Sequence, residues 1–426
     1  MAVFAAVIAR QVTGRVAPVW LIFVGGGLAV AALGVLSESG LASALIAAGP
    51  TLLFLFALFL FAGALQSSGS VEHLAHWLIG RARRPRDLPL VLFCGIGLVS
   101  AVVVNDPLVL IGVPILVAVA GRIRTDPKPL LLVLAFSVSV GSTLTPFGNP
   151  QNLLVATQSG ISDPVTTFLR YLALPTAVNL LLVGWYLRRV YGPSMPKADV
   201  EYDRLHAESP ALFPRGGWSR RLRRHPVLWV FPGTMVVLVT VDLSAALTSG
   251  PAVPFWETAL AGAAVLLCVT PARATTLRQV NWSILLLFAG LFIVVAGAVQ
   301  GGVISALAGF LPIPGPGHPS GALLATVGAS AIGSQFVSNV PWVALQIPVL
   351  TSLGYGGGTP VVWMALAAGA TLAGNVSLLG AVSNLIVVDT AEKHGVHIRL
   401  GEFVRHGLPI AAITLLVLVA LLSVGL

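Results

Sequence analysis

The chain has 426 residues, of which 56% are hydrophobic and only 9% are charged, and its formal net charge is +9. A soluble domain carries about 25% charged residues, because its hydrated surface needs them. The composition therefore excludes a soluble globular protein, a disordered chain and a coiled coil. At ~20 residues per crossing, the length allows roughly ten membrane-spanning helices. The two cysteines, Cys94 and Cys268, lie in apolar segments and match neither a disulfide framework nor a zinc motif.

Apolar segments follow one another along the whole chain, and each is predicted to be helical. In chain order they are residues 17–36, 43–65, 88–120, 130–159, 170–187, 226–248, 255–271, 283–300, 320–352, 360–388 and 407–426. The first begins after Arg10 and Arg15, as a signal peptide would, but it is 20 residues long and has no convincing small-residue cleavage site. We expect it to be retained as the first helix.

Two segments, 88–120 and 320–352, are too long for one crossing and too short for two crossings plus a turn. Each is interrupted near its middle by a polar step that ends in proline, Asn105-Asp106-Pro107 in the first and Ser338-Asn339-Val340-Pro341 in the second. Segments 130–159 and 360–388 are also long, and they are broken at Gly148–Asn152 and Gly380–Asn384. The pattern predicts two hairpins and two broken helices.

The basic residues predict the orientation, because Lys and Arg in short loops stay in the cytoplasm. Both flanks of segment 88–120 are basic, with Arg81, Arg83, Arg84 and Arg86 before it and Arg122, Arg124 and Lys128 after it. Segment 88–120 is therefore predicted to be a re-entrant hairpin that opens to the cytoplasm. The loops 301–319 and 353–359 contain no Lys or Arg, so segment 320–352 is expected to enter from outside.

Nine full crossings and two hairpins place the amino terminus in the cytoplasm and the carboxyl terminus outside, in a multi-pass protein of the cell (inner) membrane. The polar stretch 188–225, with nine basic residues, is then cytoplasmic, and only Arg170 of the 24 Lys and Arg residues lies outside. The positive charge is explained by orientation and by attraction to anionic lipid headgroups. Nucleic acid is not needed as a partner.

The two halves of the chain share short motifs in the same order. Asn105-x-Pro107 matches Asn339-x-Pro341 at an offset of 234 residues. The other matches, at offsets of 232 to 236, are Ala62–Gln66 with Ala296–Gln300, Pro114 with Pro348, Gly148…Leu153 with Gly380…Leu385, Phe168…Pro175 with Phe403…Pro409, and Pro18-x-Trp20 with Pro254-x-Trp256. Six matches in order indicate an internal duplication.

The predicted fold class is an all-α polytopic membrane protein with two inverted-topology repeats, each containing a re-entrant hairpin and a broken transmembrane helix. The first repeat spans residues 1–190 and the second 251–426. Residues 191–250 form a basic cytoplasmic linker and one unpaired span. Inverted repeats with broken helices are the architecture of secondary transporters, and irregular backbone at membrane depth is tolerated where it lines a cavity.

The two hairpin tips and two helix breaks are expected to meet near the bilayer centre and to form a substrate site. The candidate residues are Asn105, Thr143, Thr145, Asn149, Gln151, Asn152, Ser338, Asn339, Asn375, Ser377, Ser383 and Asn384, and Asp106 is the candidate for ion coupling. A structural interpretation stands beside this one, because Asn and Asp before proline are ordinary helix caps and Ser, Thr and Asn also join membrane helices.

Asp106 is the most distinctive candidate, because its counterpart in the second repeat is Val340. Capping alone does not require an acid, and an ionisable group at membrane depth is a functional candidate. The other acids are expected to be solvated near the segment ends: Glu38, Asp163, Asp242, Glu257, Asp389 and Glu392. The sequence has no His-Glu-x-x-His motif, no Gly-x-Ser-x-Gly elbow and no phosphate-binding Gly-x-x-x-x-Gly-Lys loop. We therefore expect neither an enzyme nor a resident cofactor or metal.

At these motifs the sequence resembles the ion transporter superfamily, which includes arsenite permeases, D-type sodium/proton antiporters, citrate–metal transporters and divalent anion/sodium symporters. The resemblance covers both halves and rests on Asn105-Asp106, Gly148-Asn149-Pro150-Gln151-Asn152-Leu153, Val337–Pro341 and Ala373–Leu385. In the dicarboxylate branch each tip carries Ser-Asn-Thr. Here the tips read Val104-Asn105-Asp106 and Ser338-Asn339-Val340, and the Asn-Asp tip is more similar to the arsenite permease branch.

The resemblance implies a secondary transporter that exports a small inorganic oxyacid, such as arsenite or antimonite, against proton entry. Arsenite is an uncharged polyhydroxyl species at neutral pH, so amides and hydroxyls could bind it and Asp106 could carry the proton. An anionic substrate would meet repulsion from this acid. Sodium/proton antiport and citrate or dicarboxylate transport remain alternatives, as does a channel or a structural membrane protein. The sequence leaves open the coupling ion, a homodimer and an ATPase subunit.

Overall fold

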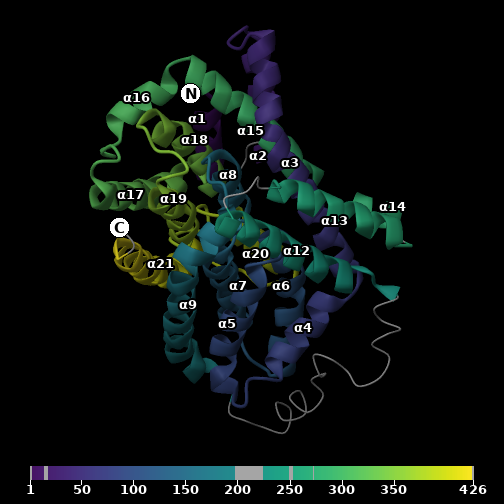
Figure 1. Ribbon diagram of the computed structural model, residues 1–426. Coiled ribbons are helices and arrows are strands. Elements are labelled where there is room, and N and C mark those ends of the chain that lie inside the picture. Colours follow the sequence, from purple (N-terminus) through teal and green to yellow (C-terminus); the bar gives the residue numbers. More distant parts are fainter. Residues whose placement is uncertain (1, 14–17, 197–223, 249–252, 272, 425–426) are drawn as a thin grey trace.

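The computed structural model describes residues 2–13, 18–196, 224–248, 253–271 and 273–424, and every regular element in these ranges is helical (Figure 1). Seven helices are long and apolar enough to cross a membrane: α3 (Glu38–Ser67), α6 (Asn105–Arg122), α9 (Pro164–Tyr191), α12 (Val227–Thr248), α15 (Trp282–Gln300), α17 (Pro319–Val337) and α21 (Leu400–Ser423). The other helices in the apolar segments are α2 (Val19–Ala32), α5 (Leu88–Ser100), α7 (Lys128–Gly141), α8 (Pro150–Gln158), α13 (Phe255–Val269), α18 (Asn339–Ser352), α19 (Pro360–Ala373) and α20 (Val382–Lys393).

All the apolar segments predicted from the sequence contain helices, but α2 and α13 are shorter than a full crossing. α2 has 14 residues, or about 21 Å at 1.5 Å per residue, against a hydrocarbon core of about 30 Å. It begins directly after Pro18, and the chain turns through left-handed Gly34 soon after its end. Proline favours a helix start and a left-handed glycine a helix end, so these residues set its length.

Short helices that the sequence pattern did not predict connect the longer ones. They are α1 (Ala2–Thr13), α4 (Ser70–Ile79), α14 (Arg273–Arg278) and α16 (Val303–Phe310), together with the 3₁₀ turns η1 (Pro85–Asp87), η2 (Ser142–Leu144) and η3 (Gly192–Ser194). Most of the basic linker, residues 197–223, lies outside the described part of the chain, as do residues 249–252.

Segment 88–120 forms two helices, α5 and α6, whose outer ends lie together. Asp87, just before α5, pairs with Arg188 on α9 at 2.6 Å. Thr125, just after α6, donates a hydrogen bond to the carbonyl of Ser194 at 3.4 Å. Both ends of the segment are therefore attached to the C-terminal end of α9, and the chain enters and leaves at one end of the molecule.

Segment 320–352 also forms a helix pair, α17 and α18, separated by Ser338. Its outer ends are joined by a hydrogen bond of 2.7 Å from the hydroxyl of Tyr355 to the carbonyl of Pro314. The backbone that follows this pair touches the loop before α9, since a Cβ on Gly357 would lie 2.1 Å from the carbonyl oxygen of Gly160. The two helix pairs therefore open at opposite ends of α9.

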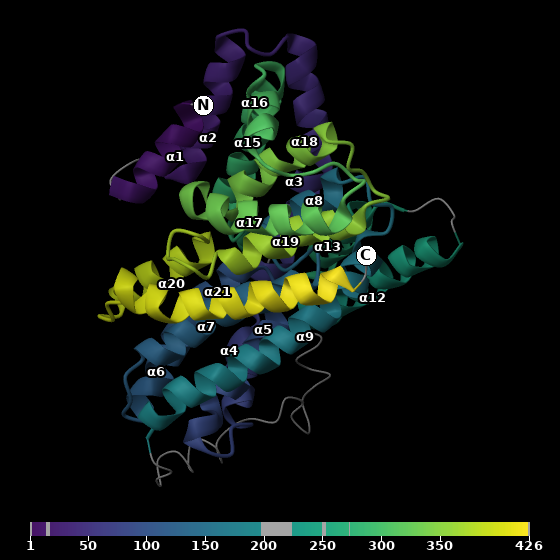
Figure 2. The same ribbon diagram turned by 90° about the vertical axis from the view of Figure 1, so that its left-hand side faces the viewer.

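Helices α9 and α21 lie side by side and run in opposite directions (Figure 2). Tyr191 at the end of α9 contacts His406 near the start of α21, with ring centroids 5.0 Å apart. Glu402 in the first turn of α21 also pairs with Lys128 at 3.2 Å. The start of α21 thus lies at the same end of the molecule as the end of α9.

Corresponding helices of the two halves make corresponding contacts. α5 packs on α7 as α17 packs on α19, and α6 packs on α20 as α18 packs on α8. Left-handed residues also recur after equivalent helices, at Gly69 and Gly302 and at Gly160 and Gly395. Each hairpin is thereby packed against the broken helix of the other half, and this arrangement brings both tips and both breaks to one region.

Glycine allows α5 and α7 to touch through their backbones. A Cβ on Gly141 would lie 1.9 Å from the carbonyl oxygen of Gly97, a distance that no real side chain can occupy. Small residues at such contacts let membrane helices approach closely. The first hairpin and the first broken helix are therefore held as one packed unit, which fixes the position of Asn105 relative to η2.

Candidate functional site

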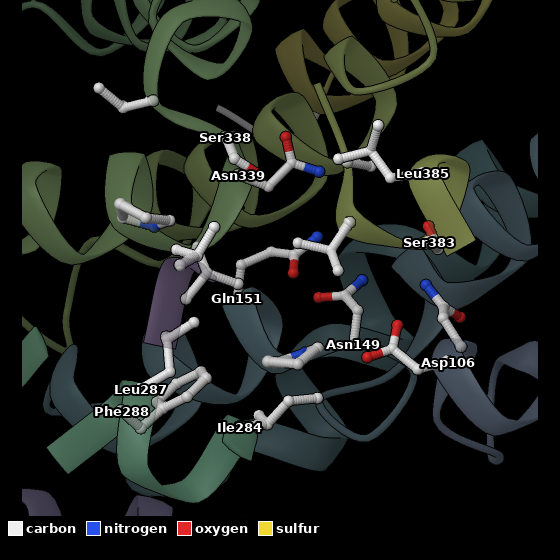
Figure 3. A pocket seen from close by; sticks show the side chains of 18 of the residues that line it. Asp106, Asn149, Gln151, Ile284, Leu287, Phe288, Ser338, Asn339, Ser383 and Leu385 are labelled. Carbon is white, nitrogen blue, oxygen red and sulfur yellow. The ribbon is translucent and has the colours of Figure 1, made fainter. Parts of the chain in front are cut away.

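A cavity with a volume of about 90 Å³ lies where four helices begin (Figure 3). Asn105 opens α6, Pro150 opens α8, Asn339 opens α18 and Val382 opens α20, and all four residues line the cavity. The first and third of these helices belong to the hairpins, and the other two follow the helix breaks. The structure therefore brings both hairpin tips and both helix breaks to one cavity.

The candidate residues that line the cavity are Asn105, Asp106, Asn149, Gln151, Ser338, Asn339 and Ser383. In the view of Figure 3, Asp106 and Ser383 lie on one side, and Asn149 and Gln151 lie nearer the middle. Ile284, Leu287 and Phe288 of α15 form an apolar wall on the other side. The polar side chains of the cavity thus come from the hairpins and breaks, where they stand among apolar residues such as Val340 and Leu385, while α15 contributes only apolar ones.

Asp106 is the only ionisable side chain among the described residues that line the cavity, and no Lys, Arg or His is among them. The positive field comes instead from the backbone. Each helix N-terminus carries roughly half a positive charge, and its free N–H groups bind electron-rich atoms. The site therefore combines one carboxyl group with the N-terminal ends of four helices.

The hairpin tips are bonded to the helix breaks of their own halves. The Asn105 amide donates to the hydroxyl of Ser142 at 3.3 Å. In the orientation that satisfies its neighbours, the Asn339 amide donates to the carbonyls of Gly380 at 2.8 Å and Ala370 at 2.9 Å. The Oδ1 atom of Asn105 is buried and has no protein partner, so one acceptor at the first tip is left for a ligand or water.

The first helix break also contacts the second half directly. Asn149 caps α8 by accepting a hydrogen bond of 2.8 Å from the backbone N–H of Asn152. The amides of Asn149 and Gln151 donate to the hydroxyl of Thr371 on α19, at 3.3 and 3.1 Å. Thr371 is fully buried and was absent from the sequence-based candidates. In the sequence, Thr371 is distinguished only as a single threonine within an apolar helix.

Other candidate residues do not line the cavity but hold the breaks in shape. The Asn152 amide donates to the carbonyls of Ser142 at 2.9 Å and Thr145 at 3.0 Å. The Asn384 amide does the same in the second half, to Gly374 at 2.9 Å and Ser377 at 3.4 Å. These two asparagines replace the hydrogen bonds that the interrupted helices lack.

The remaining four candidates also lie outside the cavity lining. Thr143 bonds Thr176 at 2.9 Å, and Thr145 donates to the carbonyl of Ala101. Ser377 donates to the side chain of Gln335 at 3.0 Å, while the amide of Asn375 is buried without a hydrogen-bond partner. Within the described residues, no cluster of three His, Cys, Asp or Glu side chains could hold a metal ion.

A multi-pass helical protein whose broken helices converge on a small cavity with a cluster of polar side chains belongs to the class of membrane transporters. The chain belongs to the citrate transporter family (CitMHS), whose model matches residues 1–370.

Among its curated relatives is an uncharacterized transporter of Mycobacterium bovis, 30% identical over 83% of this chain and 80% of the relative. A protein of rice (Oryza sativa subsp. japonica) named a silicon efflux transporter is 26% identical over 81% of this chain and 79% of its own length.

Two solved transporters share the fold at low sequence identity. YdaH of Alcanivorax borkumensis superposes with a TM-score of 0.56 at 17% identity, covering 90% of this chain and 86% of YdaH. MtrF of Neisseria gonorrhoeae also gives a TM-score of 0.56, at 16% identity, covering 88% of this chain and 80% of MtrF. As a member of the citrate transporter family, the chain is a multi-pass membrane transporter.

Proposed function

We propose that this transporter exports a small, uncharged inorganic oxyacid of the arsenite or antimonite type, in exchange for protons, by alternating access. The observation that carries the proposal is the cavity itself, which offers amides, hydroxyls and backbone N–H groups, one carboxyl group and no cationic side chain. A polyhydroxyl solute can both donate and accept hydrogen bonds with such a lining.

The size of the cavity supports a small substrate. At about 90 Å³ it is smaller than an engineered protein cavity of about 150 Å³ that binds benzene. An oxyacid with one central atom and a few hydroxyls fits this volume better than the tricarboxylate citrate. Export of a small solute also agrees with the similarity to the rice protein named a silicon efflux transporter.

The charge of the cavity lining supports an uncharged substrate. A carboxylate substrate would be attracted by the four helix N-termini but repelled by an ionised Asp106, and no Lys or Arg among the described lining residues would neutralise it. An uncharged oxyacid avoids this conflict, so the carboxyl group of Asp106 is free to bind and release the coupled proton.

The transport cycle that we propose rests on two inverted repeats, residues 1–190 and 251–426, joined by the linker and unpaired span 191–250. α5–α6 and α17–α18 would be the re-entrant hairpins. Their opening at opposite ends of α9 supports this arrangement. The basic residues around Asp87 and Lys128 support placing that end, and the amino terminus, on the cytoplasmic side of the inner membrane.

Sodium/proton antiport is the second candidate. The unpartnered Oδ1 of Asn105 lies one residue from Asp106, and two oxygen atoms at one tip could hold a hard cation such as sodium. The family's description as a citrate transporter keeps citrate or dicarboxylate transport as a third. Antiport requires a bound sodium ion, and citrate or dicarboxylate transport requires an anionic substrate beside Asp106. The oxyacid proposal requires neither.

The test compares the parental protein with Asp106→Asn in proteoliposomes that contain a pH-sensitive dye. Candidate substrates are arsenite, antimonite, silicic acid, citrate and a dicarboxylate, each with and without sodium. We expect arsenite or a similar oxyacid to drive proton movement in the parental protein. Asp106→Asn keeps the size of the side chain but removes its charge, so substrate exchange should continue while coupled proton movement is lost.

The matched control is Glu38→Gln, which neutralises an exposed acid at the start of α3 and should leave coupling unchanged. Fully coupled proton movement in the Asp106→Asn variant would remove Asp106 as the carrier. Proton movement driven by citrate or by sodium alone, with none by the oxyacids, would replace the proposed substrate with one of the two alternatives.

A further inference from the structure

A column of hydroxyl groups runs along one face of α17, away from the cavity. Thr326, Ser330 and Ser334 occur at every fourth position of α17, which places them on one side of the helix, and Ser338 follows at the same spacing directly after its end. The first three are fully buried and Ser338 nearly so, and Ser338 lines the cavity. At 1.5 Å per residue the column spans about 18 Å. It leads from the cavity toward the end of the molecule where α17 begins.

The column is not a packing feature that both hairpins share. At the 234-residue offset of the tip motif, the corresponding residues are Leu92, Ile96 and Ser100 of α5 and Val104 just before α6. Three of these four are apolar and all four are buried, and α5 packs on α7 as α17 packs on α19. Apolar side chains thus satisfy the packing of this position, so the hydroxyls of the second hairpin need another explanation.

The neighbouring helix adds two polar side chains to the column. The indole Nε1 of Trp342 on α18 donates to the hydroxyl of Ser330 at 3.3 Å. α17 and α18 pack against each other on the two sides of the tip residue Ser338 and run in opposite directions. One turn farther from the tip, α17 carries Thr326 and α18 carries Gln346.

Thr326 and Gln346 have polar side-chain atoms with no hydrogen-bond partner in the protein. The Thr326 hydroxyl and both amide atoms of Gln346 are unpartnered, and both residues are fully buried. The other hydroxyls have partners, since Ser334 donates to the carbonyl of Ser330 and Ser338 to that of Gly380 at 3.5 Å. Buried polar atoms are almost always hydrogen-bonded, and a buried water typically supplies about three such bonds.

We propose that buried water joins Thr326 to Gln346, and that the hydroxyl column carries protons between the cavity and the end of the molecule where α17 begins. This rests on the proton coupling proposed above. Each water or hydroxyl accepts a proton on one side and gives up its own proton on the other. No group changes its net charge after the transfer, and the proton ends on Asp106 or on the substrate. The exposed His318 stands two turns beyond Thr326, past the buried Ala322.

The test uses the double variant Thr326→Val and Gln346→Leu, which removes the unpartnered groups and nearly keeps the volume. Its matched control is Thr414→Val, another fully buried threonine whose hydroxyl bonds only carbonyls of its own helix. Thr326→Ser keeps the hydroxyl and serves as the rescue. Each protein is measured in proteoliposomes for substrate counterflow, for substrate-driven proton movement, and for its melting temperature in detergent.

We expect the double variant to retain counterflow, because none of its changes line the cavity, and to lose proton movement by about tenfold, a barrier increase of about 1.4 kcal/mol. Thr414→Val and Thr326→Ser should behave like the parental protein. Proton movement at the parental rate in the double variant would contradict the proposal that the hydroxyl column carries protons. A higher melting temperature in that variant would contradict the proposed buried water, because apolar side chains stabilise a site that holds no water.

The measurement separates this proposal from the one on which it rests. If the parental protein moves no protons with any substrate, the proposed coupling fails, and the melting temperature alone decides whether water fills the site. If the parental protein moves protons and the double variant does so equally, only the path fails. A sodium dependence that disappears in the double variant, with proton movement unchanged, would assign the site to a cation.

Discussion

Asn179 on α9 donates a hydrogen bond from its amide to the backbone carbonyl of Thr414 on α21, at 3.3 Å, and both residues are buried. They are 235 residues apart in the chain, the same separation as that between the matching motif residues Phe168 and Phe403. Two positions that correspond to each other can touch only where a two-fold axis passes between them. The crossing of α9 and α21 therefore marks the axis expected for the proposed inverted repeats.

The orientation of the hairpins gives the first prediction. In a background with Cys94 and Cys268 replaced by serine, we expect Arg84→Cys and Arg124→Cys to react with an impermeant thiol reagent only from the cytoplasm. Gly356→Cys should react only from outside, and nothing lies within 4 Å of a Cβ at that position. Labelling of residues 84 and 124 from opposite sides would contradict the prediction that segment 88–120 is a re-entrant hairpin.

The second prediction concerns the two hairpin tips. Asn105→Ala and Asn339→Ala should each weaken substrate binding by about five- to tenfold, since a lost hydrogen bond costs ~1 kcal/mol and 1.4 kcal/mol is tenfold. Binding to the purified protein is the measurement. Ser377→Ala, a change outside the cavity, is the control and should bind normally. Parental affinity in both tip variants would mean that these asparagines only hold the tips against their neighbours in the protein.

The third prediction concerns the asparagines that hold the helix breaks. Asn152→Ala and Asn384→Ala each leave two backbone carbonyls without their donor. We expect each to lower the free energy of unfolding by about 1–3 kcal/mol, seen as a lower melting temperature in detergent. Ser423→Ala, on the exposed end of α21, should stay within about 0.5 kcal/mol. Equal melting temperatures for all four proteins would contradict a structural role for the two amides.

The fourth prediction concerns the backbone at the second tip. Ser338 has φ 70° and ψ 163°, a region that is essentially restricted to glycine and costs other residues about 1–3 kcal/mol. Ser338→Gly should therefore raise the melting temperature. The equivalent residue of the first tip, Val104, has φ −52°. There the same change, Val104→Gly, should lower the melting temperature, because glycine loses about 0.5–1 kcal/mol of conformational entropy. A lower melting temperature at both positions would show that Ser338 is not strained.

The sequence predicted the positions of the tips and breaks, because a polar step with proline interrupts an apolar helix visibly. It did not predict which amides face the cavity. Asn149 and Asn152 lie three residues apart in one motif, yet the first lines the cavity and the second bonds backbone carbonyls. The side-chain direction depends on how the break folds back on η2, and the residue type does not encode this direction.

Two further residues show what tertiary contacts add. Thr371 completes the site from the other half, but in the sequence it looks like any polar residue that joins helices. Asp242 was expected to be solvated near the end of its span. Instead it is buried, and it accepts a hydrogen bond of 2.7 Å from the backbone N–H of Thr166 in the first turn of α9. It caps a helix to which it does not belong, and no local pattern predicts that contact.

The difference between Asp106 and Val340 makes the two hairpins electrically unequal. A membrane voltage acts on moving charge, by about 2.3 kcal/mol for one charge carried across 100 mV. Any displacement of the first tip through the bilayer moves the charge of an ionised Asp106, whereas the second tip carries no side-chain charge. In the proposed cycle, the resting voltage of the cell would therefore act on the first tip while Asp106 is ionised and would no longer act on it once a proton is bound.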